Sequence, residues 1–359
     1  MTRSGGIAAI ALAGALALSS CAANEMGGDQ PSGGLSGTLV GGGASSQQSA
    51  QEAWIAAFQG DNPDVTIEYD PAGSGAGRDT FIAGGAAFAG SDRAFNDDEV
   101  AAGEFGSCVA ESGIVEIPGY ISPIAVIFNL DGIDQLNMDA ATIAGIFSGE
   151  ITNWNDAAIA SQNEGVELPD QTITAVHRAD DSGTTENFTD YLAAAAPEVW
   201  TYEADGVWPL ESGEAAPQTS GVIDAVSNGT GTIGYADASR AGDLGTVAVK
   251  VGDEYVPYSA DAAAAIVDAS PFVEGRGEGD LAIELDRTSD AAGVYPIVLI
   301  SYLISCVEYN EPADAELVKA YFDFIVGDEG QQVAAEAAGS APISEALFEK
   351  ATAAIALIK

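Results

Sequence analysis

The chain has 359 residues, enough for two domain-sized units, and hydrophobic residues make up 47% of it, enough for ordinary packed cores. Its Asp and Glu residues number 55 against 11 Lys and Arg residues, which gives a formal net charge of -44. A surface this acidic repels nucleic acid and anionic lipid headgroups, so neither is expected as a partner.

The N-terminus reads as a lipoprotein signal. Arg3 precedes an apolar run from Ile7 to Leu18, which has the length of a signal-peptide core and is too short to span a bilayer. The run ends at Cys21 in a Leu-Ser-Ser-Cys pattern that resembles the lipobox of bacterial lipoproteins. We therefore expect a signal peptide over residues 1–20 and lipidation of Cys21 with diacylglycerol and palmitate. The alternative is a plain secretory signal followed by a chance cysteine.

Residues 21–34 are rich in Gly, Ser, Asn and Asp, which predicts a flexible tether. A protein with this start works outside the cytoplasmic membrane and is held to it by lipid chains. Two further cysteines, Cys108 and Cys306, would then lie in a compartment where disulfides persist, and a bridge between them is favoured. The alternative is a pair of buried free thiols.

Three segments of the mature chain share one design, in which a strand leads through a small polar loop into a helix. The strands are predicted at 35–40, 65–69 and 173–176 and the loops at 41–46, 73–77 and 178–184. The first helix places Ala50, Trp54, Ala57 and Phe58 on one face, the second begins near Arg78, and the third aligns Phe188, Tyr191, Leu192 and Ala195.

The alternation of strands and helices continues along the chain and predicts an α/β architecture. Further strands are expected at 124–129, 232–235, 247–251 and 295–304, and further helices at 138–147, 222–227, 313–324 and 330–338. No transmembrane segment is expected after the signal.

The three polar loops favour an anion as ligand. A helix N-terminus presents unpaired N–H groups and a partial positive charge, and Ser or Thr hydroxyls there can donate to an oxyanion as well as cap the helix. Arg178 is the cation of these loops suited to bidentate oxyanion binding, and Asp180 can orient its guanidinium. For each loop alone the simple alternative is N-capping, and for Arg178 it is an exposed ion pair. Asp181 reads as a solvated loop carboxylate.

Asp92 would select among anions. An ionised aspartate only accepts hydrogen bonds, so it repels an anion that carries no proton. Phosphate keeps one or two protons near neutral pH and sulfate keeps none, so an acceptor in the pocket rejects sulfate. Outside such a pocket, Asp92 would be an ordinary turn residue.

These residues together resemble the high-affinity phosphate-binding proteins of bacterial phosphate ABC transporters, over essentially the whole mature chain. Residues 178–184 (Arg-Ala-Asp-Asp-Ser-Gly-Thr) are similar to that family's Arg-Ala-Asp-x-Ser-Gly-Thr anion loop. Gly73-Ser74-Gly75 resembles its second anion loop and Gly90-Ser91-Asp92 its proton-accepting aspartate. Residues 149–156 (Gly-Glu-Ile-Thr-Asn-Trp-Asn-Asp) are similar to a structural segment of these proteins.

The resemblance implies a periplasmic-binding-protein-like fold of type II (a Venus flytrap), with two α/β lobes joined by two hinge crossovers. Residues 35–119 and 290–359 would form lobe I and residues 120–289 lobe II, which places both cysteines of the expected bridge in lobe I. The implied phosphate ligands are Ser45, Ser46, Ser74 and Asp92 from lobe I and Arg178, Ser182, Gly183 and Thr184 from lobe II, with Asp180 in support.

One loop departs from the family pattern. The first anion loop usually reads Gly-Ala-Gly-Ala/Ser-Thr/Ser-Phe-Pro, whereas Ser45-Ser46-Gln47 lacks the Phe and the Pro. The residue at position 46 contributes a backbone N–H in the family, so its contact can survive the change.

The sequence thus predicts a monomeric binding protein, not an enzyme, that captures inorganic phosphate by lobe closure and delivers it to the permease of an ABC transporter. No cofactor or metal is expected. The alternatives are a binding protein for another oxyanion, a phosphate sensor or adhesin with the same fold, and an enzyme. Against the enzyme stand a lone histidine, His177, and the absence of Gly-x-Ser-x-Gly and P-loop motifs.

Overall fold

The computed structural model describes residues 34–359. The predicted signal peptide, the predicted lipidation of Cys21 and residues 21–33 of the predicted tether lie outside the described residues. In the described part, no helix is both long and apolar enough to cross a membrane.

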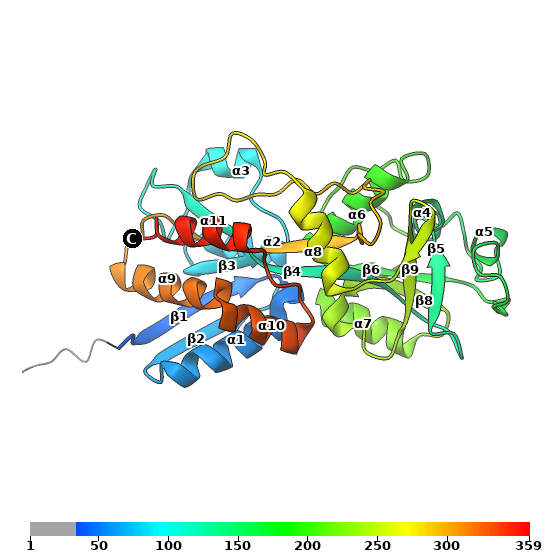
Figure 1. Cartoon of the computed structure of the whole chain (residues 1–359), viewed down its shortest axis with the longest axis horizontal. Coiled ribbons are helices and arrows are strands. Elements are labelled where there is room, and N and C mark those ends of the chain that lie inside the picture. Colours follow the sequence, from blue (N-terminus) through cyan, green and yellow to red (C-terminus); the bar gives the residue numbers. More distant parts are fainter. Residues whose placement is uncertain (1–33) are drawn as a thin grey trace, which may run out of the picture. The chain divides into compact units, whose positions relative to one another are not determined.

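The strands join into one mixed sheet, and the helices connect them (Figure 1). The strands are β1 (Gly37–Gly43), β2 (Val65–Asp70), β3 (Phe88–Ser91), β4 (Ile114–Asn129), β5 (Gln135–Met138), β6 (Thr174–Arg178), β7 (Glu214–Ala216), β8 (Thr232–Asp237), β9 (Gly245–Val251), β10 (Glu254–Val256) and β11 (Val298–Cys306). The helices are η1 (Ser45–Gln47), α1 (Gln48–Asp61), α2 (Ser74–Ile82), α3 (Asp97–Ala102), α4 (Ala140–Ser148), α5 (Ala157–Ala160), α6 (Gly183–Ala195), α7 (Gln218–Asn228), η2 (Ala238–Arg240), α8 (Ala260–Ala269), α9 (Pro312–Val326), α10 (Asp328–Ala338) and α11 (Glu345–Ile355).

Strand β4 belongs to both halves of the sheet. It pairs with β11 over Ile114–Pro123 and with β8 over Ile124–Asn129, antiparallel in both cases. The first half-sheet consists of β2, β1, β3, β11 and β4 up to Pro123. The second half-sheet consists of β4 from Ile124 with β8, β6, β7, β9, β5 and β10. The predicted boundary at residues 119/120 falls inside this continuous strand and stays a prediction.

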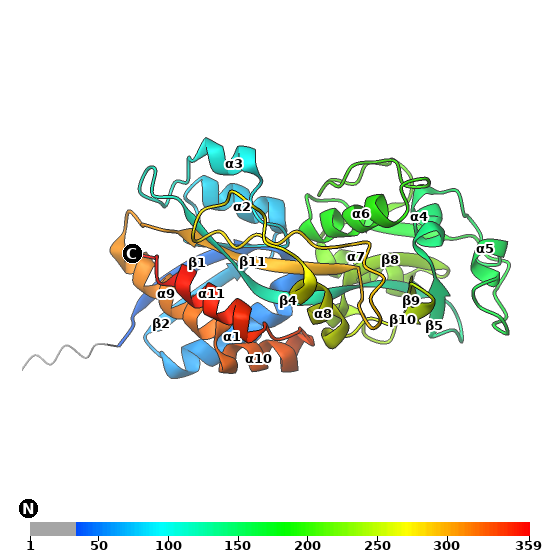
Figure 2. The ribbon, with the colours of Figure 1, turned by 45° about the horizontal axis from the view of Figure 1, so that its top comes forward.

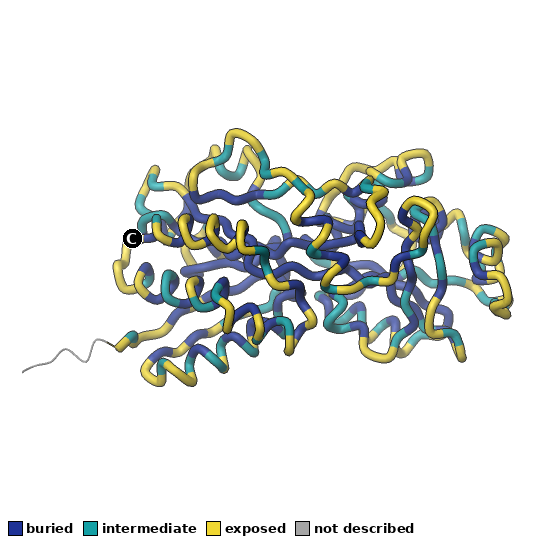
Figure 3. Tube along the Cα trace, viewed as in Figure 1, coloured by how far each residue is buried: buried dark blue, intermediate teal, exposed yellow. Residues whose placement is uncertain are grey.

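Both long strands are buried. Every residue of β11 and all but the last of β4 are buried, as the dark tube through the middle of the molecule shows (Figure 3). Their sequences are nearly continuous apolar runs, as expected for strands covered on both faces. In the first half-sheet, α2 packs on β1 and β3 from one side, and α1 and α9 cover the other side (Figure 2).

Most predicted elements are confirmed to within a few residues, and three boundaries within the strand–loop–helix segments are wrong for a physical reason. The helix expected near Arg78 begins at Ser74, and the glycines expected in the first loop belong to β1. Arg178, expected in a loop, is the last residue of β6. The glycines serve close packing instead of a loose loop: a methyl group on Gly77 would lie 2.3 Å from Cα of Gly43.

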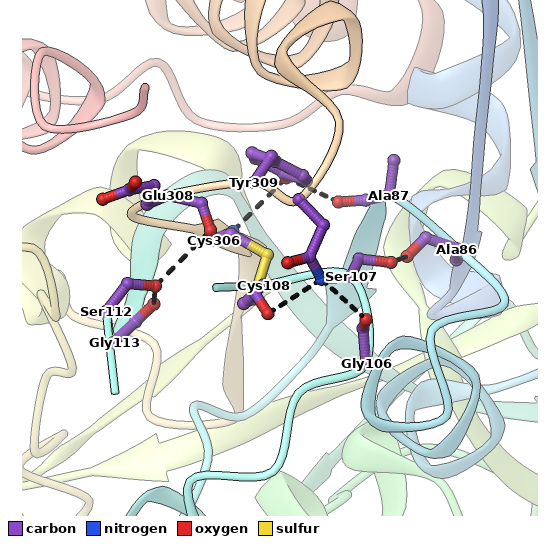
Figure 4. Close-up of a disulfide and its surroundings, with 11 residues drawn as sticks. Ala86, Ala87, Gly106, Ser107, Cys108, Ser112, Gly113, Cys306, Glu308 and Tyr309 are labelled. Carbon is purple, nitrogen blue, oxygen red and sulfur yellow. Dashed lines mark hydrogen bonds between the residues drawn. A yellow bond between two sulfur atoms is a disulfide. The ribbon is translucent and has the colours of Figure 1, made fainter. Parts of the chain in front are cut away.

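The predicted disulfide between Cys108 and Cys306 is confirmed, with Cα atoms 5.2 Å apart (Figure 4). It joins the loop after α3 to the end of β11. Tyr309 reinforces the junction, since its hydroxyl donates to the carbonyl of Ala87 at 2.6 Å and accepts from the N–H of Cys306. The side chain of Asn310 donates to the carbonyl of Cys108 at 3.0 Å.

Candidate functional site

In the first half-sheet, the predicted ligands follow the carboxyl ends of three parallel strands. Strand β1 pairs with both β2 and β3, so the segments after these strands emerge at one edge. Ser45 and Ser46 follow β1 in η1, Ser74 begins α2 after β2, and Asp92 follows β3. All four are at most 3% exposed, so this edge of the sheet is an enclosed polar site.

Glycines allow these segments to meet. A methyl group on Gly43 would lie 1.9 Å from the carbonyl oxygen of Gly90, and the φ angle of Gly43, 141°, disfavours other residues. The carbonyl of Gly90 accepts the N–H of Ala44 at 2.8 Å. The η1 turn is thereby fixed against the segment that carries Asp92.

In the second half-sheet, β6 leads into the N-terminus of α6. Ser182 caps this helix, because its Oγ accepts the N–H of Thr185 at 3.2 Å. Gly183 and Thr184 form the first turn, whose N–H groups have no partner within a helix. These residues are buried, which is uncommon for a helix end unless something satisfies it.

Asp92 is the point where the two halves of the sheet converge. Its Oδ1 accepts hydroxyl hydrogens from Ser46 and Ser301, both at 2.6 Å, and its Oδ2 accepts that of Thr184 at 2.8 Å. Its own N–H donates to Oγ of Ser74 at 3.2 Å. Three hydroxyl groups from three different elements therefore donate to one carboxylate, and a fourth, from Ser74, accepts the backbone N–H of the same residue.

The start of α6 lies directly against this carboxylate segment. A methyl group on Gly183 would lie 2.7 Å from Cβ of Asp92 and 2.9 Å from Oγ of Ser74. The side chain of Asn187 donates to the backbone carbonyl of Asp92 at 2.6 Å. Only a glycine at position 183 permits this approach.

Arg178 is buried and held by Asp180. Its Nε donates to Oδ1 of Asp180 at 2.8 Å and its Nη2 donates to Oδ2. Burial alone would raise the pKa of Asp180, but the hydrogen bonds and the charge of Arg178, together with the N–H of Gln218, outweigh burial, and the net pKa is lowered. Asp180 is therefore ionised at neutral pH, and its two oxygens hold the guanidinium of Arg178 in place.

The N-terminus of α7 also reaches the site, which the sequence reasoning missed. Oδ1 of Asp180 accepts the N–H of Gln218 at 2.9 Å. Oγ of Ser45 accepts the N–H of Thr219 at 3.1 Å and lies 2.9 Å from its hydroxyl. The helix was expected from residue 222, but the small polar residues 218–221 after Pro217 were a signal for an earlier start.

Arg78 is a second buried cation beside the site, and it was expected only as the start of a helix. Its Nη1 donates to Oγ of Ser91 at 2.9 Å, and its Nη2 lies 3.6 Å from Oδ1 of Asp181. Burial lowers the pKa of Arg78, although the acids nearby oppose this shift. Asp181, predicted to be solvated, is about half exposed.

The structure thus brings together Ser46, Ser74, Asp92, Gly183 and Thr184, with Ser182 as the cap of their helix and the Arg178–Asp180 pair at the start of the same loop. Ser45 is turned toward Thr219 instead. The residues that sequence reasoning missed are Arg78, Asn187, Gln218, Thr219 and Ser301.

His177 does not join this group. Its ring stacks on Trp208 with centroids 5.0 Å apart, and its Nδ1 lies 2.9 Å from the carbonyl oxygen of Arg178. Within residues 34–359, no cluster of three or more His, Cys, Asp or Glu side chains could hold a metal ion.

A cavity of about 820 Å³ adjoins the site and shares Asp92 with it. Its walls carry both signs of charge, including Arg93, Arg287, Glu186 and Asp190. This mixture gives the cavity no preference for anions, in contrast to the converging helix ends beside it.

Comparisons with known proteins identify the family of this chain. A model of the PBP superfamily domain matches residues 28–329. The phosphate-binding protein PstS 3 of Mycobacterium tuberculosis (strain ATCC 25618 / H37Rv) is 33% identical over 343 residues, covering 91% of each chain. Phosphate-binding protein PstS2 of Mycobacterium bovis (strain BCG / Pasteur 1173P2) is 30% identical over 373 residues, covering 98% of each.

Solved structures show the same architecture. A high-affinity periplasmic phosphate-binding protein bound with phosphate aligns with a TM-score of 0.71 and 20% identity, covering 88% of this chain and 93% of that one. The phosphate-binding protein of Stenotrophomonas maltophilia aligns with a TM-score of 0.65 and 20% identity, covering 89% and 94%. The predicted periplasmic-binding-protein-like fold with two α/β lobes is confirmed.

Proposed function

The chain belongs to the PBP superfamily and, within it, to the family of phosphate-binding proteins, and we propose that it binds inorganic phosphate outside the cytoplasmic membrane and delivers it to an ABC-type permease. One observation carries the proposal for this chain: a buried carboxylate, Asp92, lies among hydroxyl donors at the N-terminus of a buried helix. That combination offers many donors to an oxyanion and one acceptor to its proton.

The donors are available in the right form. Oγ of Ser74 already accepts the N–H of Asp92, and Oγ of Ser182 accepts that of Thr185. Each hydroxyl hydrogen is therefore left to donate to a ligand. Arg178 adds a charged donor whose geometry is fixed by Asp180, and the first turn of α6 adds the N–H groups of Gly183 and Thr184.

Asp92 gives the selectivity. A phosphate that carries a proton donates it to the carboxylate, whereas sulfate has no proton to give and is repelled. Binding and delivery require no catalytic step, and none is assigned to these residues.

Capture proceeds by closure. The ligands come from both halves of the sheet, and in the closed form Gly183, Thr184 and Asn187 of α6 contact the Asp92 segment. A ligand that binds both sides stabilises this form, which is a hinge equilibrium shifted by contacts made only on closing. We place lobe I at residues 35–119 and 290–359 and lobe II at 120–289. The chain passes between the lobes twice, along β4 and along the segment before β11.

The same proposal covers the N-terminus and the assembly. Cys21 would carry the lipid anchor, residues 21–34 would tether the binding unit to the membrane, and the protein would act as a monomer until it docks on the permease. Incorporation of labelled palmitate into the wild-type protein, but not into Cys21→Ser, checks the anchor.

Titration calorimetry on the ligand-stripped mature protein tests the function. We expect a dissociation constant for phosphate on the order of micromolar or tighter and no heat from sulfate. Arg178→Ala should weaken phosphate binding by about two orders of magnitude, because it removes a charged bidentate donor.

Asp92→Asn should bind phosphate less tightly and should gain measurable affinity for sulfate, because the amide no longer repels an unprotonated anion. Asp181→Asn is the control, since it removes the same charge from the neighbouring loop without touching Asp92. The proposal would be refuted if the wild-type protein did not bind phosphate or if it bound sulfate more tightly than phosphate.

A further inference from the structure

Asp92 is reached by a hydrogen-bond chain that starts outside the predicted anion loops. Ser301, in the middle of β11, donates to Oδ1 of Asp92 at 2.6 Å. Oγ of Ser301 in turn accepts a hydrogen bond from Nε2 of Gln47 at 2.7 Å, and Oε1 of Gln47 accepts one from Nε2 of Gln51 at 2.8 Å. Tyr321 of α9 completes the chain by donating to Oε1 of Gln51 at 2.8 Å.

The direction of this chain is set by one backbone carbonyl. Nε2 of Gln47 also lies 3.3 Å from the carbonyl oxygen of Tyr302, which can only accept. The amide nitrogen of Gln47 must therefore face Ser301 and Tyr302, and its oxygen must face Gln51. Because Ser301 accepts from Gln47, its single hydrogen points to Asp92.

The chain is isolated from water. Gln47 and Ser301 are 0% exposed, Gln51 is 1% exposed, and Tyr321 is 0% exposed. Buried polar groups of this kind are costly unless each is satisfied, so the orientation of every member depends on its neighbours.

We propose that Gln47 and Ser301 are positioning residues that determine the phosphate specificity of Asp92. This inference rests on the proposed function. Ser301 and Ser46 together occupy Oδ1, which fixes the plane of the carboxylate. Oδ2 then has Thr184 as its hydroxyl donor, and Thr184 lies in the first turn of α6 among the proposed ligands. Oδ2 is therefore the oxygen that accepts the proton of the bound phosphate.

The same arrangement opposes sulfate. Sulfate can be accommodated only if the carboxyl group turns away from it. The hydrogen donated by Ser301 resists this rotation, since turning the carboxylate weakens a charge-assisted hydrogen bond. Without this donor, the backbone of Asp92 stays in place, but its carboxylate turns away more easily from an unprotonated anion.

The test compares Ser301→Ala with Ser305→Ala in the mature protein. Ser305 lies on the same strand, is equally buried and does not contact Asp92. Calorimetry gives the dissociation constants of inorganic phosphate and of sulfate for each protein. We expect Ser301→Ala to lower the phosphate-to-sulfate selectivity about tenfold, the worth of one charge-assisted hydrogen bond, and Ser305→Ala to leave it unchanged.

Gln47→Met provides a second variant of similar volume. It should lower the selectivity in the same direction, because Ser301 then loses the donor that directs its hydrogen to Asp92. Thermal unfolding of each variant separates a loss of fold from a loss of selectivity.

The outcomes are distinguishable. If wild type binds phosphate selectively and both variants keep its selectivity, the positioning role is refuted while the proposed function stands. If phosphate and sulfate affinities fall by the same factor, the chain is structural and the inference fails. If wild type itself does not bind phosphate, the proposed function fails and the inference falls with it.

Discussion

Asp237 is a fully buried carboxyl group at the junction of the two half-sheets, where β8 pairs with Ile124 of β4. Its oxygens accept the hydroxyl of Tyr120 at 3.1 Å and the N–H of Ser239 at 3.0 Å, and within residues 34–359 no basic side chain pairs with it. Burial raises its pKa from 3.8 to about 6, because desolvation outweighs these hydrogen bonds.

This raised pKa predicts a stability that falls as the pH rises. A raised pKa in the folded state favours the protonated group, so its contribution is complete below pH 3.8 and is lost as the pH passes about 6. A shift of this size corresponds to about 3 kcal/mol. We expect Asp237→Asn to be more stable than wild type at pH 8 by up to this amount, measured by urea unfolding.

The comparison between pH 5 and pH 8 isolates the effect. The advantage of Asp237→Asn over wild type should shrink at pH 5, because the wild-type carboxyl group is then largely protonated. Asp224→Asn, at an exposed position of α7, should behave like wild type at both pH values. An equal difference at both pH values would show that the carboxyl group does not titrate as described.

At the scale of elements, the three strand–loop–helix segments could be predicted from the sequence because the residues that indicate them are neighbours in the chain. Ser182 lies next to the helix that it caps, and the glycines at 73, 75 and 77 lie next to their strand. The role of Ser301 was not readable, since it stands in an apolar strand and its partner Asp92 is 209 residues away. The early start of α7 was missed because apolar periodicity marks the face of a helix better than its first turn.

The N-terminus of α6 leads to a prediction that separates closure from folding. Gly183 has no positive φ angle, so alanine suits its helical position, but the added methyl group would lie 2.7 Å from Cβ of Asp92. We expect Gly183→Ala to fold with a melting temperature close to that of wild type and to lose phosphate affinity by at least about tenfold. Differential scanning calorimetry and phosphate titration give the two quantities.

Gly60→Ala is the matched control for this substitution. Gly60 lies in α1, and a methyl group there meets no atom within 4 Å. It should stabilise the protein slightly, by about 0.5–1 kcal/mol, and leave phosphate binding unchanged. Normal phosphate affinity in Gly183→Ala would mean that α6 does not need this contact for binding.

At the scale of the whole molecule, the disulfide closes a long stretch of chain. Cys108 and Cys306 are 198 residues apart, and the bridge joins two segments that β4, the second half-sheet and β11 separate in sequence. We expect the Cys108→Ser/Cys306→Ser variant to lose about 2–5 kcal/mol of unfolding free energy, measured by guanidinium unfolding. Phosphate affinity should be unchanged, since the bridge lies away from Asp92 and Arg178; a loss of affinity without a loss of stability would contradict this account.

Five of the arginines pair with carboxylates in or near the interior. Arg78, Arg178 and Arg287 are at most 5% exposed and Arg276 is 10% exposed at its side chain, and each pairs with a carboxylate. Arg93 bridges Glu99 and Glu186 in the same way. These arginines fix loops and therefore do little to neutralise the surface, which carries most of the net charge of -44.

A surface charged in this way repels itself in the folded state, so added salt should stabilise the protein. The screening length falls from about 10 Å at 0.1 M salt to about 3 Å at 1 M, which removes repulsion between surface carboxylates. The buried arginine pairs are screened much less and should keep their contribution. We expect the melting temperature to rise by at least about 2 °C between these salt concentrations, equally in NaCl and KCl, because screening depends on ionic strength alone. A rise in only one salt would indicate a bound cation, and a fall would mean that exposed ion pairs, not repulsion, dominate the surface.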